Sequence, residues 1–163
     1  MSIVERFQKH YEYERDCNLK MLAMIESVPA SNRPDARFQQ AVNLAGHLAA
    51  CRENWLDRMQ SDGLQQTAWF EEMCDWTTLR SRYEVIEGRW ADYLASLTDN
   101  QLAEDFEFPV GGGSKYRVPT EVQLMQLVGH ACYHRGQIAL LVDQLGGETV
   151  DTDYLFWAVR PPK

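Results

Sequence analysis

The chain has 163 residues, of which 45% are hydrophobic and 25% charged, and its formal net charge at pH 7 is −8. This length and composition predict one globular domain, residues 1–163, and exclude a disordered or low-complexity chain. The acidic excess argues against a general nucleic-acid binder or a binder of anionic membranes, which need a basic surface, and no apolar run reaches the roughly 18 residues of a membrane span.

The N-terminus and the cysteines favour a cytoplasmic protein. Residues 1–9 alternate charged with apolar side chains, unlike the apolar core of a signal peptide. The four cysteines, at positions 17, 51, 74 and 132, include no C-x-x-C pair. This pattern fits a reducing compartment better than a disulfide framework.

Two amphipathic helices are predicted in the first 60 residues. Apolar side chains recur at steps of three and four over residues 3–28 and again over residues 35–60. The loop between the two helices, residues 29–34, has a proline at each end. On the second helix the apolar line consists of Ala41, Leu44, Leu48, Cys51, Trp55 and Met59.

A third helix is predicted over residues 76–97, where seven apolar or aromatic residues recur at alternating steps of three and four. Asp75 or Thr77 can cap its start, and residues 98–100 end it. The seam consists of Trp76, Leu79, Tyr83, Ile86, Trp90, Tyr93 and Leu97.

A short β-hairpin or a long ordered loop is predicted before the last helix. Residues 106–108 and 116–118 alternate with period two on either side of the glycine-rich residues 111–114. The glycines and the following Lys115 lack the G-x-x-x-x-G-K-[ST] spacing of a phosphate-binding loop. We therefore interpret them as a flexible turn.

The last long helix is predicted over residues 124–145. Residues 120–123 have the form of a capping box, and Gly146 and Gly147 supply the stop. Residues 154–159 are apolar enough to pack back on the helices. Four helices of similar length, each with one apolar stripe, predict an all-α four-helix bundle with a small β-hairpin between the third and fourth helices.

Three of the four histidines are candidate metal ligands. His130 and His134 lie one turn apart on one face of the last helix, and His47 lies at the edge of the apolar stripe of the second helix. One shared metal with positions open to water or substrate explains all three. Ala131 stands where the H-E-x-x-H motif has glutamate, which excludes that metalloprotease motif. The alternative is three hydrogen-bonded core histidines, because spacing does not show that the two helices are adjacent.

Other histidine and cysteine positions carry weaker signals. Cys51, one turn beyond His47, is a fourth ligand, a redox-active thiol or, in the interpretation we favour, a small core residue. Cys132 faces away from its neighbouring histidines and is interpreted as a packing residue. His10 is not expected to be a ligand. Catalytic residues stay unassigned, since no Ser-His-Asp or Cys-His arrangement is evident by spacing.

Several segments resemble the DinB-like superfamily. HACYHRGQ at residues 130–137 matches its H-x-x-x-H-R-G-Q signature, and His47 followed by Trp55 eight residues later matches its helix-two motif. Asn18, Leu22 and residues 153–155 also agree with the family, so the resemblance covers nearly the whole chain. It implies a four-helix bundle with one long crossover, often as a homodimer, and a divalent metal held by His47 and the two histidines of the signature, His130 and His134.

The resemblance also implies a metal-dependent enzyme with a small-molecule substrate. Several characterised relatives act through low-molecular-weight thiols such as bacillithiol or mycothiol, and others are hydrolases. We expect zinc or nickel, or else iron, to activate such a thiol for S-transfer, with the hairpin around Gly112 bordering the metal and selecting the electrophile. The alternatives are hydrolysis by an activated water and a non-catalytic metal-binding or structural dimer. Arg135 and Gly136 of the signature are expected to serve helix packing or salt bridges.

Overall fold

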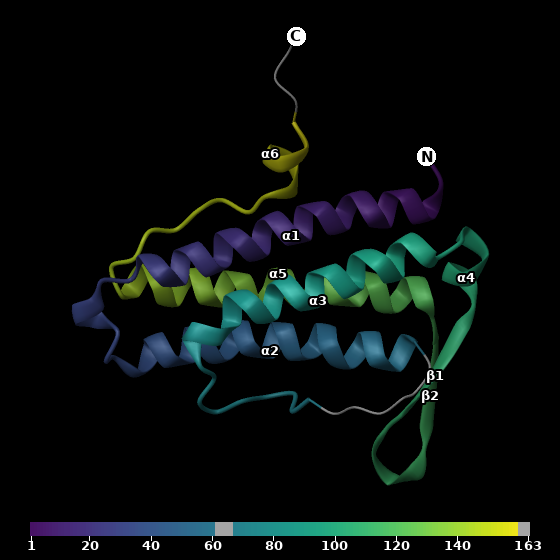
Figure 1. The fold of residues 1–163 in the computed structure, drawn as a ribbon, viewed down its shortest axis with the longest axis horizontal. Coiled ribbons are helices and arrows are strands. Elements are labelled where there is room, and N and C mark those ends of the chain that lie inside the picture. The colour runs from purple at the N-terminus through teal and green to yellow at the C-terminus, as the bar shows by residue number, and fades with distance from the viewer. Residues whose placement is uncertain (61–66, 160–163) are drawn as a thin grey trace.

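The computed structural model, which describes residues 1–60 and 67–159, is built around four long helices (Figure 1). They are α1 (Ile3–Ser27), α2 (Ala36–Met59), α3 (Trp76–Ser96) and α5 (Thr120–Gln144). α3 and α5 each pack against both α1 and α2, which confirms the predicted bundle. The shorter elements are η1 (Ala30–Asn32), α4 (Asp99–Ala103), β1 (Asp105–Pro109), η2 (Gly111–Gly113), β2 (Lys115–Pro119) and α6 (Tyr154–Ala158).

The bundle has one long crossover, between α2 and α3. Residues 67–75 run along the outside of α2 and lead into α3 at the end of the bundle where α2 begins (Figure 1). α2 and α3 therefore run in the same direction along the bundle, and α1 and α5 run the opposite way. This topology is the one that the family resemblance implied, and it lays residues 67–75 along α2.

The helix ends follow ordinary capping chemistry. Asp75 caps α3, as predicted, because its Oδ1 accepts a hydrogen bond of 2.9 Å from the backbone N–H of Thr77. α5 stops where predicted: Gly146 adopts a positive φ of 73°, and the N–H of Gly147 bonds the carbonyl of Val142 at 2.9 Å. The left-handed backbone at Gly146 is the reason for a glycine at this position.

The predicted capping box at the start of α5 does not form. Thr120 is already the first residue of the helix, and Pro119 precedes it without a side-chain cap. The Thr120 hydroxyl donates to the carbonyl of Glu104 at 3.2 Å and is therefore not turned toward its own helix. The Thr120 N–H bonds the same carbonyl at 3.0 Å. The prediction was wrong because α5 begins directly from β2, four residues before the apolar seam starts.

The core consists of two apolar clusters along the bundle. One contains Ile25 and Ile138, and the other contains Leu56 and the fully buried Trp90. Each fully buried aliphatic side chain contributes about 1.5–3 kcal/mol relative to exposure. Glu14, which is also buried, falls between the two clusters in its position along α1.

Two arginines neutralise Glu14. Its Oε1 accepts a hydrogen bond of 2.8 Å from Arg135, which is 2% exposed, and its Oε2 accepts one of 2.8 Å from Arg52. A buried charge is tolerated only when it is paired in this way. The signature arginine therefore forms the expected salt bridge. Gly136 is not closely packed by the described part of the chain, since a Cβ there would meet no atom within 4 Å outside its own helix.

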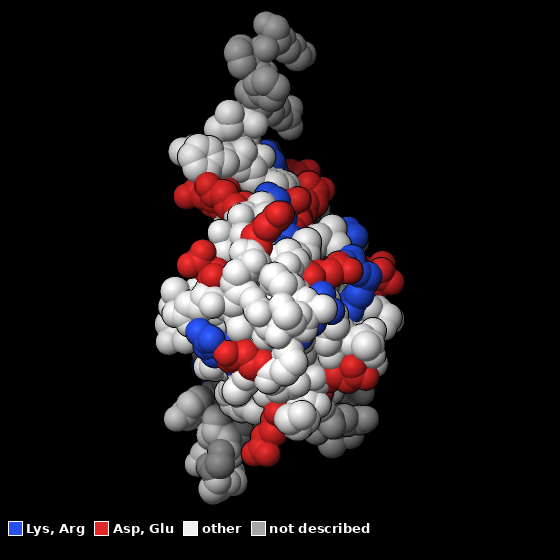
Figure 2. Space-filling view, turned by 90° about the vertical axis from the view of Figure 1, so that its left-hand side faces the viewer, with Lys and Arg blue, Asp and Glu red and all other residues white. Residues whose placement is uncertain are grey.

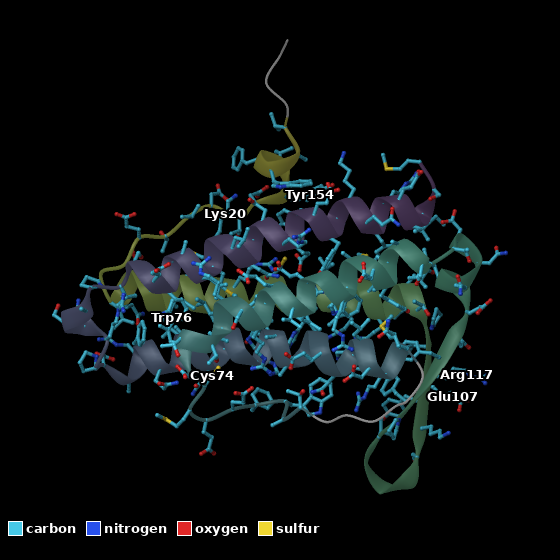
Figure 3. All side chains as sticks on the ribbon, in the orientation of Figure 1. Lys20, Cys74, Trp76, Glu107, Arg117 and Tyr154 are labelled. Atoms are coloured by element: carbon cyan, nitrogen blue, oxygen red, sulfur yellow. The ribbon has the colours of Figure 1, made fainter. Side chains whose placement is uncertain are left out.

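The predicted hairpin is present at one end of the bundle (Figure 1). β1 and β2 pair antiparallel with Asp105 opposite Pro119 and Pro109 opposite Lys115. The glycines form the turn, and Gly112 has a φ of 76°, which confirms a turn in place of a phosphate-binding loop. Glu107 and Arg117 lie side by side on the two strands (Figure 3).

The C-terminal segment packs on α1 only in part. The Tyr13 hydroxyl donates to the carbonyl of Thr152 at 2.6 Å, and Tyr154 stacks on His10 with ring centroids 5.2 Å apart. Leu155 and Phe156 remain 63% and 68% exposed. Trp157 of α6 also packs on Tyr13, with ring centroids 5.7 Å apart. The predicted packing of this segment is therefore correct for one side of α6 and wrong for Leu155 and Phe156, which the short helix turns outward.

Acidic and basic side chains are interspersed at the end of the bundle that carries η1 (Figure 2). No broad basic area is visible on that face. Within the described residues, none of the helices combines the length and the apolar character that crossing a membrane requires.

Candidate metal centre

Three histidine side chains converge between α2 and α5, which pack directly against each other. His130 and His134 come from successive turns of α5, and His47 faces them from α2. The Nε2 atom of His130 lies 3.2 Å from Nε2 of His47 and 3.1 Å from Nε2 of His134. Each residue offers one ligand atom, and all three of these atoms lie within 4.8 Å of one another. The helices α2 and α5 are therefore neighbours, which the spacing of the histidines in the sequence did not show.

Hydrogen bonds on the opposite ring nitrogens orient two of these side chains. Nδ1 of His47 lies 2.6 Å from the carbonyl oxygen of Trp69, and Nδ1 of His134 lies 2.7 Å from Oε1 of Gln137. Since a carbonyl or amide oxygen only accepts, both Nδ1 atoms carry the hydrogen. When these rings are neutral, the Nε2 atoms of His47 and His134 therefore carry no hydrogen, and their lone pairs point into the cluster. This is the arrangement by which proteins orient metal-binding histidines.

The distances fit one shared ion. With metal–nitrogen bonds of about 2.05 Å, a tetrahedral ion holds two nitrogens about 3.3 Å apart and an octahedral ion about 2.9 Å apart. The observed separations of 3.1 and 3.2 Å fall between these values. His130 Nε2 carries at most one hydrogen, so at most one of the two short contacts is a hydrogen bond. The other brings two lone pairs together, and a cation relieves that repulsion. The cluster could therefore hold a metal ion.

Burial keeps two of the three candidate ligands unprotonated. Burial lowers the pKa of His47, which is 5% exposed. Burial, followed by the neighbouring His134 and His47, lowers the pKa of His130 to about 4. Both rings are therefore neutral at pH 7, the state in which imidazole binds a metal.

The crossover covers His47, and sequence reasoning did not anticipate this contact. The Phe70 ring stacks on the His47 ring with centroids 4.1 Å apart and planes 6° apart. Polar side chains of α2 bind successive backbone groups of the returning chain. Asn54 bonds Thr67, His47 bonds Trp69, and Asn43 bonds Glu72 and Cys74. In the sequence, the only indication of this contact is that amide and imidazole side chains recur along one line of α2.

The hairpin lies farther from the cluster than expected. Phe106 and Phe108 of β1 pack on Trp55, with ring centroids 6.4 and 4.9 Å from it. Trp55 is about two turns along α2 from His47. The observed cover of His47 comes from the crossover, and the expectation that the hairpin around Gly112 borders the metal is not supported by these contacts.

Cys51 lies beside His47 but outside the cluster of three ligand atoms. Its Sγ is 3.7 Å from Nδ1 and 3.6 Å from Nε2 of His47. The group of ligand atoms that lie within 4.8 Å of one another consists of the three histidines. Burial raises the pKa of the Cys51 thiol to about 12, so the thiol is protonated at neutral pH. These observations favour the core-packing interpretation.

Two further sequence interpretations concern residues away from the cluster. His10 packs against the C-terminal segment, as its stacking on Tyr154 shows, and is not part of the cluster. Cys132 is exposed, so its interpretation as a packing residue was wrong. The periodicity placed it correctly on the side of α5 away from the histidines, but there it borders an open hollow, lined also by Tyr13 and residues 150–154, and is not packed in the core.

The comparison with protein families agrees with the site. The family model described as DinB family matches residues 1–161. The chain belongs to the DinB family. Comparison with curated proteins and comparison with solved structures gave no match. In this DinB protein the two signature histidines lie beside the helix-two histidine, and the signature arginine serves the buried ion pair with Glu14.

Proposed function

We propose that His47, His130 and His134 bind one divalent transition metal, zinc or nickel in preference to iron, and that the protein is a metal-dependent enzyme that acts on a small molecule with a low-molecular-weight thiol. The observation that carries the proposal is the convergence of three Nε2 atoms, two of them on rings oriented through Nδ1. A histidine that only packs in the core needs one hydrogen-bond partner. That role does not explain why the nitrogens of two further imidazole rings lie close to it.

A divalent ion on three imidazoles supplies a Lewis acid that lowers the pKa of a bound thiol or water toward neutrality. The chain itself orients the ligands and shields one side. The Trp69 carbonyl and the Phe70 ring hold His47, and a mostly apolar hollow of about 230 Å³ beside these residues is lined also by Leu44 and Asn43. This volume suits a small substrate.

The family resemblance favours thiol transfer over hydrolysis. The observed contacts of His47 and His134 come from carbonyl, amide, thiol and aromatic groups. Two carboxylates, Glu71 and Glu72, line the hollow beside His47, and Glu71 is paired with Arg82 at 2.6 Å. His47, His130 and His134 would hold the ion in either reaction, and the choice between thiol and water is therefore left to the activity test below.

Metal content is the first test. Protein prepared without an affinity tag is expected to hold close to one equivalent of metal per chain by elemental analysis, and His134→Ala to lose most of it. His10→Ala is the matched control, since His10 lies outside the cluster. Less than about a tenth of an equivalent in the native protein, even after incubation with zinc or nickel, would contradict the shared site.

Activity is the second test. The metal-loaded protein is assayed with a panel of low-molecular-weight thiols and a generic aryl halide electrophile, and in parallel with a reporter ester. We expect a thiol-dependent rate that chelation removes and metal restores. Metal-dependent ester hydrolysis without thiol transfer would assign the site to hydrolysis. Tight metal binding with neither rate would leave a metal-binding dimer as the function.

A further inference from the structure

A mostly apolar hollow of about 210 Å³ lies between α1 and α5, on the side of α5 away from the candidate metal centre. Val128 lines it and comes two residues before His130, so at 3.6 residues per turn the two side chains leave the helix roughly 160° apart. The hollow is lined by Ile3, Arg6, Phe7, His10, Met125 and Val128. None of these six residues belongs to the histidine cluster, so this α1–α5 hollow is separate from the candidate metal centre.

The walls of the α1–α5 hollow suit a hydrocarbon group. Met125 is 58% exposed and Ile3 is 46% exposed, so large apolar side chains border the hollow without being covered by the described chain. A cavity of about 150 Å³ with aliphatic and aromatic walls is large enough to bind benzene. The α1–α5 hollow therefore has room for a six-membered ring with a short side chain.

Two nitrogen-bearing side chains stand along the α1 edge of the hollow. Arg6 and His10 are four residues apart, which places them one turn apart on the same face of α1. Arg6 forms no ion pair with a described residue, and no Asp or Glu lines the hollow. An unpaired guanidinium beside an apolar hollow, in a chain of net charge −8, is complementary to an anion that has an apolar body.

The His10 side chain is held in place but lacks a hydrogen-bond partner. Its ring stacks on Tyr154 and meets Tyr13 edge to face, and each pair of ring centroids is 5.2 Å apart. Its Nδ1 atom is buried and has no hydrogen-bond partner among the described residues. Buried polar atoms in folded proteins almost always have a partner, so this nitrogen points to a bound molecule.

A smaller cavity behind the hollow limits how deep a ligand can lie. Phe7, His10 and Val128 line both spaces, and the inner cavity of about 20 Å³ has room for about one water molecule. Glu14 and Arg52, which also line the inner cavity, bond each other at 2.8 Å and therefore offer no free charge. The apolar body of a ligand must stay in the outer hollow, and one water can link its polar group to Nδ1 of His10.

We propose that the α1–α5 hollow binds a small monocarboxylic acid with an aromatic or branched apolar body. The carboxylate lies along α1, where Arg6 donates to it and His10 contacts it directly or through one water. The apolar body lies on Phe7, Met125 and Val128. A carboxylate matches the planar donor pattern of a guanidinium, and the single charge of Arg6 is balanced by a monoanion. The inference does not rest on the proposed enzymatic function, because binding is tested on metal-free protein.

The first test is an NMR titration of the metal-free full chain with 3-phenylpropionate. Metal removal prevents the carboxylate from binding an ion at the histidine cluster. We expect a Kd of about 1 mM or tighter, and binding at least about 5-fold weaker for the neutral analogue 3-phenylpropionamide, which lacks the charge that Arg6 recognises. The Met125 methyl and His10 ring signals should shift, whereas the His134 ring signals should not.

The second test compares matched substitutions. Arg6→Gln keeps a long polar side chain but removes the charge, and should weaken binding of the acid about 5-fold or more. Lys9→Gln is the control, because it removes one positive charge three residues along α1 at a position that does not line the hollow, and it should change the Kd less than about 2-fold. Met125→Trp fills the hollow and should weaken binding about 10-fold or more. Unchanged circular dichroism would show that each variant is folded.

Several results would overturn the proposal. They are no binding of the acid at millimolar concentration, equal affinity for the acid and the amide, shifts confined to the histidine cluster, or equal effects of Arg6→Gln and Lys9→Gln. Native protein that binds no acid but sediments as a dimer that Met125→Trp disrupts would overturn it in favour of a second copy of the chain. Binding to neutral phosphatidylcholine vesicles without binding of the acid would overturn it in favour of a membrane contact.

Discussion

Gly46, the residue before His47, offers a sharp test of how the crossover is held on α2. A Cβ at this position would lie 2.6 Å from Sγ and 3.1 Å from Cβ of Cys74. Cys74 has little room to retreat, because its N–H bonds Asn43 at 3.0 Å and its carbonyl bonds Gln39 at 2.9 Å. We therefore expect Gly46→Ala to push the crossover away from α2.

The change in the free energy of unfolding caused by Gly46→Ala follows from two opposing effects. Alanine gains about 1 kcal/mol over glycine in a helix interior. Overpacking costs about 1–3 kcal/mol, and displacing the anchored segment breaks hydrogen bonds worth about 1 kcal/mol each. Gly46→Ala should lower the free energy of unfolding by about 1–2 kcal/mol. Gly88→Ala on α3, where nothing lies within 4 Å of the Cβ position, should raise it by about 0.5–1 kcal/mol.

The assay is urea unfolding of metal-free protein, followed by circular dichroism. Cys74→Ala removes the closest atom, so the double variant with Gly46→Ala should recover at least about 1 kcal/mol relative to additivity. Because the crossover also carries the Trp69 carbonyl that orients His47, Gly46→Ala should weaken metal binding, whereas Gly88→Ala should not. Equal stabilisation by both alanine substitutions, or a strictly additive double variant, would refute the reasoning.

Three further outcomes follow from buried charges and from the candidate metal centre. Glu14→Gln leaves the guanidinium of Arg135 buried without its counter-charge, and urea denaturation should show a loss of about 3–5 kcal/mol. Burial raises the pKa of Glu87 above its value in the unfolded chain. The protonated side chain therefore stabilises the folded state fully at pH values below the unfolded pKa, and this stabilisation is lost as the pH rises through the folded pKa. Glu87→Gln should therefore raise the melting temperature more at pH 7 than at pH 4. Burial and the neighbouring rings lower the pKa of His130 to about 4, so in metal-free protein the ring protons of His130 should titrate well below the usual imidazole range near 6.5 in an NMR pH series.

Each of these outcomes has its own control. Glu26 also lies on α1 and pairs with an arginine, Arg80, but both side chains are more than half exposed, so Glu26→Gln should cost less than about 1 kcal/mol. Similar losses for Glu14→Gln and Glu26→Gln would show that the buried ion pair is not formed. An equal melting-temperature change at the two pH values would contradict the assignment for Glu87. A titration midpoint near pH 6.5 or above for the ring protons of His130 would contradict its lowered pKa.

The local features of this protein were readable from its sequence. Helical periodicity predicts the four long helices because each apolar stripe must be buried, and Trp90 and Ile138 are buried as expected. The four-residue step between His130 and His134 places both rings on one face of α5 whatever the tertiary structure is. The glycine turn of the hairpin and the glycine stop of α5 follow in the same way, because a positive φ is a local property of the backbone.

The tertiary structure alone decided which helices are neighbours and what covers them. The adjacency of His47 to the two signature histidines depends on the packing of α2 against α5, and the cover over His47 depends on the path of the crossover. Cys132 was misassigned because α5 has apolar residues on nearly all sides, so periodicity does not show which side faces solvent. Such long-range contacts join residues far apart in the chain, and the local spacing of side chains carries no record of them.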